Sequence, residues 1–181
     1  MRKKLTACAF ALTLCLSALI AAGCGGDSNT STTGAGSSET TAAASTADEG
    51  FYFELEGQKL TPGMAQDDMI SAIGETDNVF SAPSCAGQGT DYTYTYGSVE
   101  IVTVPNADGV NEISTIALRD DLTSTPEGVS LYMTTADMTA AYGEDYTQSG
   151  NAYTYVKGNV KLSFIIENDE ITSIEYSLAT A

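Results

Sequence analysis

The chain of 181 residues contains no histidine and no tryptophan, and only 7 of its residues are Lys or Arg. The absence of histidine excludes Ser-His-Asp and Cys-His catalysis and removes the commonest zinc ligand. The sequence also lacks a G-x-S-x-G motif and a glycine loop that could cradle phosphate. We therefore expect no catalytic residues, no metal site and no cofactor, and an enzyme is the least favoured of three function classes.

Basic residues are scarce, whereas 24 residues are Asp or Glu, so the formal net charge is −17. Removal of residues 1–23 would take away three of the 7 bases and no acid, which leaves 4 bases against 24 acids, a net charge of −20. Such a chain repels phosphate polyanions, and we expect no nucleic-acid partner. Solubility explains the acidic surface as well as recognition of a basic partner does.

The sequence has four cysteines, too few in the folded part to form a disulfide framework. Cys8 and Cys15 lie in an apolar N-terminal segment, Cys24 follows that segment, and Cys85 stands alone in the remainder. Cys85 therefore has no partner within the chain. The folded part has to be stabilised by a hydrophobic core.

The N-terminus has the layout of an export signal. Basic residues 2–4 precede an apolar run over residues 5–22 that ends in small residues. A membrane-spanning anchor is the alternative, although the run is short for a span of ~20 residues. We predict that residues 1–23 are removed as a signal peptide.

The end of the apolar run, Leu19-Ile-Ala-Ala-Gly23-Cys24, resembles the lipobox of bacterial lipoprotein signals. The resemblance implies cleavage before Cys24 and attachment of diacylglycerol to its sulfur, so the partner would be a lipid bilayer on the extracytoplasmic side of the cell membrane. Two acyl chains anchor a protein durably, whereas one chain binds only reversibly. Secretion with a free Cys24 is the alternative.

Residues 24–50 follow as a tether of Gly, Ser, Thr and Ala with four acids and one Asn. This composition cannot bury enough apolar surface to offset the entropy of ordering, so we predict disorder. The folded domain then covers residues 51–181.

One sequence box occurs twice in that domain, at Met64–Glu75 and at Met133–Glu144, 69 residues apart. Each copy has apolar residues at helical spacing and then a glycine, which predicts a short helix. Each is followed by tyrosine-rich runs around Gly97-Ser98 or Gly158-Asn159, which predict hairpins with type II′ turns. Two later segments, Glu112–Leu118 and Glu170–Tyr176, break alternation in the same way, as a shared β-bulge would.

These patterns predict an α+β fold. Two tandem helix–β-meander repeats, about 51–121 and about 122–181, would form one antiparallel sheet with both short helices on one face. The hairpin turns predict that Tyr94 faces Ile101 and that Tyr155 faces Leu162 on the core side.

A helix followed by a meander, present twice, resembles the fold of the beta-lactamase inhibitory protein, whose Gly-Met entry to the helix is matched by Gly63-Met64. The chain is also similar to small lipoproteins of anaerobic Gram-positive bacteria that have no known activity. That similarity rests on short motifs: Ala82-Pro-Ser-Cys85-Ala, Tyr92-Thr-Tyr94, Thr125-Pro-Glu-Gly128 and Tyr142-Gly143. The inhibitor fold implies a sheet surface that binds a partner.

Three features allow a functional interpretation beside a structural one. Cys85 lies in an eight-residue insertion relative to the second copy, either as an inert, partly buried thiol or in a partner-binding or redox loop. The ten tyrosines fit core packing better than a ligand-stacking surface. Asp67-Asp68 suits a helix N-terminus better than catalysis, and Asn106–Glu112 suits a hairpin turn better than calcium binding.

We therefore expect a non-enzymatic, lipid-anchored surface protein that binds an envelope protein or peptide. Capture of a solute or glycan for an uptake system is the alternative, and a pocket lined by tyrosine and carboxylates would favour it.

Overall fold

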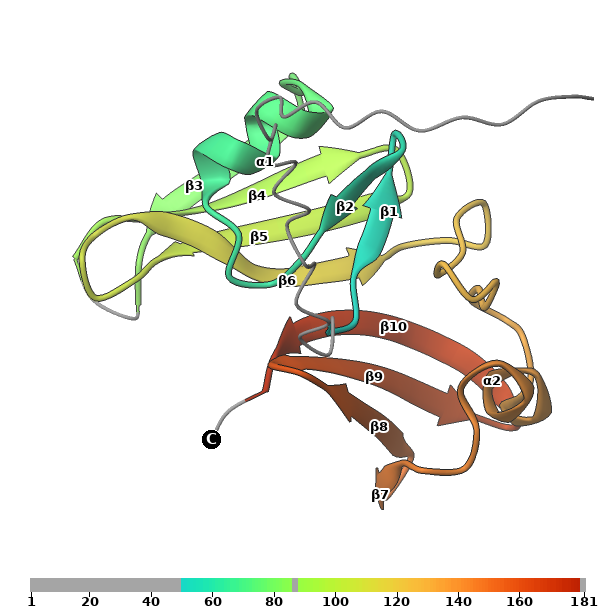
Figure 1. Cartoon of the computed structure of the whole chain (residues 1–181). Coiled ribbons are helices and arrows are strands. Elements are labelled where there is room, and N and C mark those ends of the chain that lie inside the picture. Colours follow the sequence, from blue (N-terminus) through green and yellow to red (C-terminus); the bar gives the residue numbers. More distant parts are fainter. Residues whose placement is uncertain (1–49, 86–87, 180–181) are drawn as a thin grey trace, which may run out of the picture. The chain divides into compact units, whose positions relative to one another are not determined.

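The computed structural model describes residues 50–85 and 88–179. Within them, eight strands form one antiparallel sheet in the order β3-β4-β5-β6-β10-β9-β8-β7, and β1 and β2 form a separate pair (Figure 1). With two short helices, this is an α+β architecture, as predicted. The strands are β1 Phe53–Leu55, β2 Gln58–Leu60, β3 Val79–Pro83, β4 Thr90–Tyr96, β5 Val99–Pro105, β6 Asn111–Leu118, β7 Thr147–Ser149, β8 Ala152–Lys157, β9 Val160–Glu167 and β10 Glu170–Leu178.

The predicted signal peptide, residues 1–23, and the tether up to residue 49 lie outside the described residues. The described residues all belong to one compact unit. No helix in the described part of this unit is long and apolar enough to cross a membrane.

The two helices, α1 Gln66–Ile73 and α2 Thr135–Tyr142, lie where the repeated box predicts them. Both end at a glycine with positive φ, Gly74 and Gly143, whose N–H donates to the carbonyl four residues earlier. Eight-residue helices are marginal alone, so they depend on packing. Each buries one methionine, Met69 or Met138, in the core.

The hairpin turns and their registers are confirmed. Gly97 and Gly158 have φ of 56° and 58°, whereas the residues after them do not have positive φ, which is the type II′ pattern. Tyr94 pairs with Ile101, and Tyr155 pairs with Leu162.

The predicted bulges are also present. The pairing of β5 with β6 skips Ser114, and the pairing of β9 with β10 skips Thr172, so both strands carry an extra residue next to a buried isoleucine. The extra residue lets Ile113 and Ile116 of β6 both face the core although they are three residues apart.

The core lies on the sheet face that the helices and the β1–β2 hairpin cover. Register brings Tyr94, Ile101, Ile116, Tyr176, Leu162 and Tyr155 into one row across six strands, and all six side chains are buried. Met69, Met138 and Phe53 belong to the same cluster, which places α1, α2 and β1 on this face.

Three strands, β2, β3 and β7, and one core segment were not predicted. β3 and β7 form the two edges of the sheet, one in each half. Val129 and Leu131, in the linker before α2, are buried in the core. The connection between the halves is therefore part of the packed structure.

Candidate functional site

The two cysteines singled out by sequence have different outcomes. Cys24, the predicted lipidation site, lies outside the described residues. Cys85 follows β3 and carries a free thiol that is exposed, so the expected partial burial is wrong. The thiol lies in the loop between β3 and β4, where Ser84 N–H donates to the Gly89 carbonyl at 3.1 Å.

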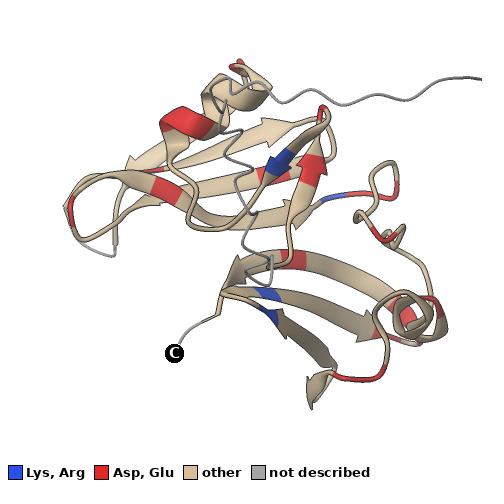
Figure 2. Cartoon of the chain, viewed as in Figure 1, with Lys and Arg blue, Asp and Glu red and all other residues tan. Residues whose placement is uncertain are grey.

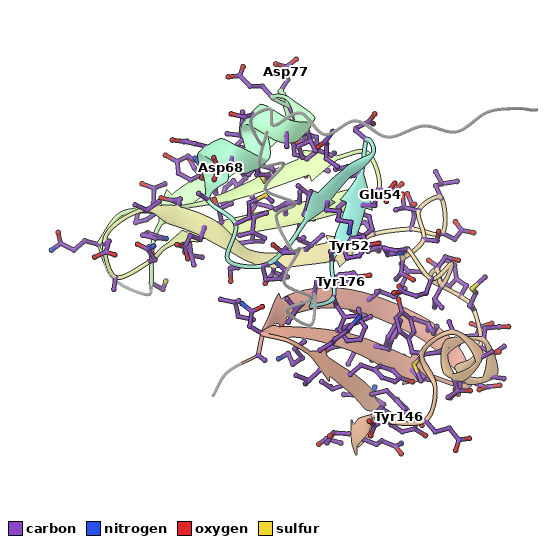
Figure 3. All side chains as sticks on the ribbon, in the orientation of Figure 1. Tyr52, Glu54, Asp68, Asp77, Tyr146 and Tyr176 are labelled. Carbon is purple, nitrogen blue, oxygen red and sulfur yellow. The ribbon has the colours of Figure 1, made fainter. Side chains whose placement is uncertain are left out.

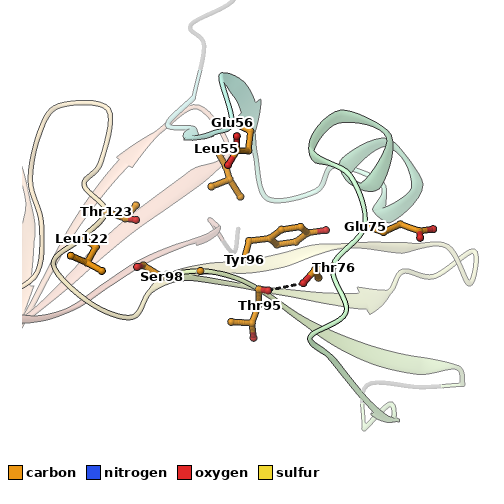
Figure 4. Close-up of a pocket in the computed structure, with 10 residues that line it drawn as sticks. Leu55, Glu56, Glu75, Thr76, Thr95, Tyr96, Ser98, Leu122 and Thr123 are labelled. Atoms are coloured by element: carbon orange, nitrogen blue, oxygen red, sulfur yellow. Dashed lines mark hydrogen bonds between the residues drawn. The ribbon is translucent and has the colours of Figure 1, made fainter.

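A pocket of about 480 Å³ lies at one end of the first half of the sheet (Figure 4). It is formed by the turn after β1, the end of α1, the turn between β4 and β5, and the residues after β6. Its walls comprise Leu55, Glu56, Glu75, Thr76, Thr95, Tyr96, Gly97, Ser98, Leu122 and Thr123.

The pocket walls are held by short hydrogen bonds. The Tyr96 hydroxyl donates to the Gly74 carbonyl at 2.7 Å, which ties β4 to the end of α1. The Thr76 hydroxyl donates to the Thr95 carbonyl at 3.0 Å and accepts the Asn78 N–H (Figure 4). The walls that follow α1 are therefore fixed by β4.

The pocket combines two carboxylates, Glu56 and Glu75, with a phenol and two leucines. Burial first, and then the negative charge of Glu75, raise the pKa of Tyr96 above 10.0, so its hydroxyl is a proton donor at neutral pH. Leu122 is 84% exposed. Such a lining suits a small ligand that carries hydrogen-bonding groups or a positive charge.

Sequence reasoning missed this pocket because its parts come from four separate turns. One signal was available: Glu56-Gly57 is an acidic residue followed by glycine, a hairpin signal, and both have positive φ, as a type I′ turn requires. That turn sends the chain back as β2 and places Glu56 at the rim.

The other face of the sheet is covered by no described helix or strand. Its central rows combine short hydroxyl and aliphatic side chains with the charged side chains of Glu100, Glu175 and Lys161, and most are half-buried by their neighbours in the sheet. We call this the open face; its residues include Thr93, Thr95, Val102, Thr115, Ala117, Ser163, Ile165, Ser173, Ser177 and Thr154.

The tyrosines pack in the core, as expected. Eight of the ten belong to the core cluster or pack against it. Tyr146, beside β8, and Tyr176, on β10, belong to this set (Figure 3). The alternative of a tyrosine stacking surface does not apply to the open face.

The Tyr176 hydroxyl is buried without a hydrogen bond of normal geometry, beside the hydroxyls of Tyr142 and Thr125. Tyr142 instead donates to Glu127 at 2.6 Å. Burial is the main cause that raises the pKa values of Tyr142 and Tyr176 far above 10.0. These groups stay neutral and link α2 to the linker and to β10.

The acidic residues that the sequence singled out do not come together in one site. Asp67 and Asp68 are exposed in the first turn of α1, where they complement the helix dipole. Asn106 accepts the N–H groups of Asp108 and Val110 and donates to Glu112, so the hairpin interpretation of that loop is confirmed. Within the described ranges, no three His, Cys, Asp or Glu side chains form a group that could hold a metal ion.

The two sheet edges differ in length and in polarity. β7 has three exposed residues, Thr147–Ser149, all polar. β3 has five residues, and Phe80 and Val79 on it are 68% and 42% exposed. Natural sheets usually protect their edges with short strands, charged residues or proline, and on β3 only Pro83, at its end, does so.

Charge is also unevenly distributed. No Lys or Arg occurs from residue 60 to residue 118, a stretch that holds α1 and β3 to β6 and carries eight acids. The four bases of the described residues are Lys59, Arg119, Lys157 and Lys161, outside that stretch (Figure 2). The β3 edge therefore lies in a half with a strong excess of acids, whose two bases are Lys59 and Arg119, the latter paired with Glu100.

The described residues define an α+β protein with an open sheet face, the pocket around Tyr96, and a β3 edge that carries exposed apolar side chains. Comparison of the chain with protein-family models, with curated proteins and with solved structures finds no match. Function has to be argued from these surfaces.

Proposed function

We propose that the chain is an extracytoplasmic lipoprotein, anchored in the cell membrane through lipid on Cys24, and that its folded domain binds a protein or peptide without catalysing a reaction. The layout of residues 1–24 supports the anchor. The lack of histidine and of nucleophile motifs supports a binding function.

We also propose that residues 51–121 and 122–181 are tandem copies of one helix–β-meander unit, in an arrangement like that of the beta-lactamase inhibitory protein. Matching backbone hydrogen bonds support this. Ile113 N–H donates to the Met64 carbonyl, and Ile171 N–H donates to the Met133 carbonyl, both at 2.8 Å. The bulges at Ser114 and Thr172 follow these isoleucines in both halves.

The open face is the observation that carries the binding proposal. A broad surface of short hydroxyl and aliphatic side chains with a few charged ones (Glu100, Glu175 and Lys161) suits contact with another protein, because most of its hydrogen-bonding groups are ordered at a low cost in side-chain entropy. Thr115 lies at its centre, paired with Val102 on one side and Ser177 on the other.

A pull-down from envelope extract with residues 44–181 tests this proposal. Thr115→Arg places a long charged side chain in the middle of the open face and should abolish retention of the partner. Ala72→Arg makes the same charge change at an exposed position of α1 and should leave retention unchanged. Equal retention by the two variants would reject the open face as the binding surface.

Capture of a solute or glycan is the second candidate, and the pocket with Tyr96, Glu56 and Glu75 favours it. A thermal-shift screen of sugars, amino acids and divalent ions tests it. A true pocket ligand should raise the melting temperature of the parent chain but not of Glu75→Gln. If no solute raises it while a protein is retained, solute capture is rejected.

The anchor has its own test. Cys24→Ser in the full chain should prevent incorporation of radiolabelled lipid and leave the precursor uncleaved. Cys85→Ser is the matched control and should be labelled and processed like the parent. Continued labelling of the Cys24→Ser chain would reject the lipid anchor.

A further inference from the structure

The outer edge of β3 is the strongest unassigned feature of the described residues. Thr95 N–H donates to the Asn78 carbonyl at 3.0 Å, and Ser84 N–H donates to the Gly89 carbonyl at 3.1 Å. Even-numbered residues of this segment therefore direct their backbone groups toward β4. Because the direction alternates along a strand, the odd-numbered residues Val79, Ser81 and Pro83 direct theirs away from the sheet.

These outward groups form a short, unused hydrogen-bonding edge. β4 is the only described strand that pairs with β3, and no described residue hydrogen-bonds to the outward N–H and carbonyl groups of Val79 and Ser81. Pro83 has no N–H, so the edge stops there. It offers two donors and three acceptors, enough to pair with a short extended segment.

The side chains beside this edge favour one kind of occupant. Phe80 and Ala82 lie on the open face, opposite Thr93 and Asp91 of β4. Phe80 is 68% exposed, so its ring is available to a cation, while Ala82 is too short to screen Asp91 from a neighbouring strand.

Asp91 adds a specific acceptor. Its Oδ1 atom is buried and has no hydrogen-bond partner among the described residues. Strands lie about 4.8 Å apart, so a Lys or Arg side chain on an added strand could extend across Ala82 toward the half-buried Asp91 carboxylate. The negative charge of the region also favours a basic side chain on the added strand, since residues 60–118 carry eight acids and no base.

We infer that the β3 edge binds an extended, Lys- or Arg-bearing peptide segment, which adds as a ninth strand beside Val79–Pro83 and places a basic side chain between Phe80 and Asp91. This inference rests on the proposed peptide-binding function and names the class of partner. The polar, three-residue β7 edge is not used in this way.

Pairing of two copies through the same edge is disfavoured. A symmetric pair centred on Phe80 would satisfy Val79 and Ser81 of each copy. It would also bring two anionic halves together, each with Asp77 beside the strand and directed away from the sheet (Figure 3). Like charges make this occupant less favourable than a basic segment.

The test uses residues 44–181 and a blocked synthetic peptide, Thr-Val-Arg-Val-Arg-Val-Thr, with a control peptide that has Glu in place of Arg. Calorimetry should detect binding of the Arg peptide only. Ser81→Pro removes an N–H that faces solvent, so the chain should fold normally yet bind the peptide about tenfold or more weakly. Phe80→Thr should weaken binding, whereas Val156→Thr, which removes another exposed apolar side chain on the open face, should not.

Hydrogen exchange gives an independent readout. In the free chain the amides of Val79 and Ser81 should exchange fast, while the Phe80 amide, bonded to β4, exchanges slowly. The Arg peptide should protect Val79 and Ser81 selectively. Protection elsewhere, or none at saturating peptide, overturns the inference.

Three outcomes separate this inference from the broader proposal. If Ser81→Pro binds the peptide as tightly as the parent does, charge attraction alone explains the binding, and the inference that the peptide pairs with the β3 edge is wrong. Retention of an envelope protein that is lost in Thr115→Arg but kept in Ser81→Pro leaves the proposed function standing without the edge. A concentration-dependent dimer, seen by sedimentation and abolished by Ser81→Pro, shows that a second copy is the occupant and overturns the basic peptide.

Discussion

The two halves of the described chain place their helices with the same backbone contacts but fill the space beneath them differently. In the second half, Phe164 of β9 packs between the rings of Tyr142 and Tyr155, with centroids at 5.4 and 6.1 Å. The corresponding position of β5 in the first half is Thr103, which is equally buried and donates to the Gln66 side chain at 2.7 Å.

The difference shows that the residues that fix the backbone geometry are not the ones that determine which side chains fill the core. Turn glycines, the bulges and the helix-ending glycines fix the strand registers in both halves. The buried position on the strand can then be filled by an aromatic ring or by a threonine whose hydroxyl is paired, because either excludes water and adds no unpaired polar atom at that position.

The largest expected effect is in the aromatic half. Phe164→Ala should lower the free energy of unfolding by about 3–5 kcal/mol, because it removes a buried ring and leaves a cavity among rigid neighbours. Thr103→Val in the other half keeps the volume and loses one hydrogen bond, so about 1 kcal/mol is expected. Urea titration of both variants measures the contrast, and equal losses would mean that the halves do not differ in this way.

The residue that precedes the methionine before each helix also differs between the halves, and with it the backbone strain. Gly63 has φ of 89°, whereas Tyr132 at the matching position has φ of 68°, which is strained for a side chain with a Cβ. Gly63→Ala should cost roughly 1–2 kcal/mol. The nearest atom to an added Cβ would be Leu178 Cδ2 at 3.5 Å, an ordinary contact, so the cost comes from backbone strain.

Tyr132→Gly should instead raise the free energy of unfolding slightly. It relieves the strain, but glycine loses more conformational freedom on folding, by roughly 0.5–1 kcal/mol, so the net gain is small. Tyr132 is 61% exposed, and little packing is lost. A destabilising Tyr132→Gly would show that the exposed ring makes a contact worth more than the strain.

Much of this fold followed from local signals. Gly97-Ser98 and Gly158-Asn159 specified two turns, and with them the residues that face each other across the hairpins. The shared spacing of Ile113 with Ile116 and of Ile171 with Ile174 indicated the bulges. These features depend on residues close in sequence, where backbone preferences act directly.

The features that were missed depend on long-range placement. β3 contains Ser81 and Pro83 and reads as a loop, and it becomes a strand because β4 offers its free edge. The pocket assembles Glu56, Glu75 and Leu122 from segments that only the complete sheet brings together. Sequence predicted the Cys85 insertion, and the structure shows where its residues go: the loop after β3 has six residues against two after β7, and the edge strand has five against three.

The two helices also differ in their N-terminal caps, and exchanging the cap residues should measure how much that difference contributes to the stability of each half. Thr134 and Asp137 form a capping box on α2, whereas Ala65 at the matching position of α1 has no side-chain cap. Thr134→Ala should cost about 1 kcal/mol, and Ala65→Thr should recover part of that amount in the other half. Thermal unfolding of the two variants and of the double variant measures both effects.

The cap should also depend on pH. Hydrogen bonds from the side chain and backbone of Thr134 hold the pKa of Asp137 below 3.8. Its contribution is therefore present above that pH and lost as the pH falls through the lowered value. The difference between parent and Thr134→Ala should shrink in acid, and a constant difference would mean that the Asp137 carboxylate does not contribute.

The smallest expected effects come from the two phenols that tie β4 and β8 to the helix ends. The Tyr155 hydroxyl donates to the Gly143 carbonyl at 2.7 Å, as Tyr96 does to Gly74. At neutral pH, Tyr155→Phe and Tyr96→Phe should each cost roughly 0.5–1 kcal/mol, with the larger loss at Tyr155 because it is 3% exposed.

At alkaline pH, the parent should become less stable than Tyr155→Phe. Burial first, then the charges of Tyr146 and Glu144, raise the pKa of Tyr155 to about 12. The unfolded chain releases this proton near pH 10, so the parent loses stability as the pH rises from 10 toward 12, a loss that Tyr155→Phe does not suffer. Phenylalanine should therefore be the less stable residue at pH 7 and the more stable one near pH 12, as urea titrations at both pH values would show. If Tyr155→Phe remains less stable at pH 12, burial does not raise the pKa of Tyr155 in the folded chain.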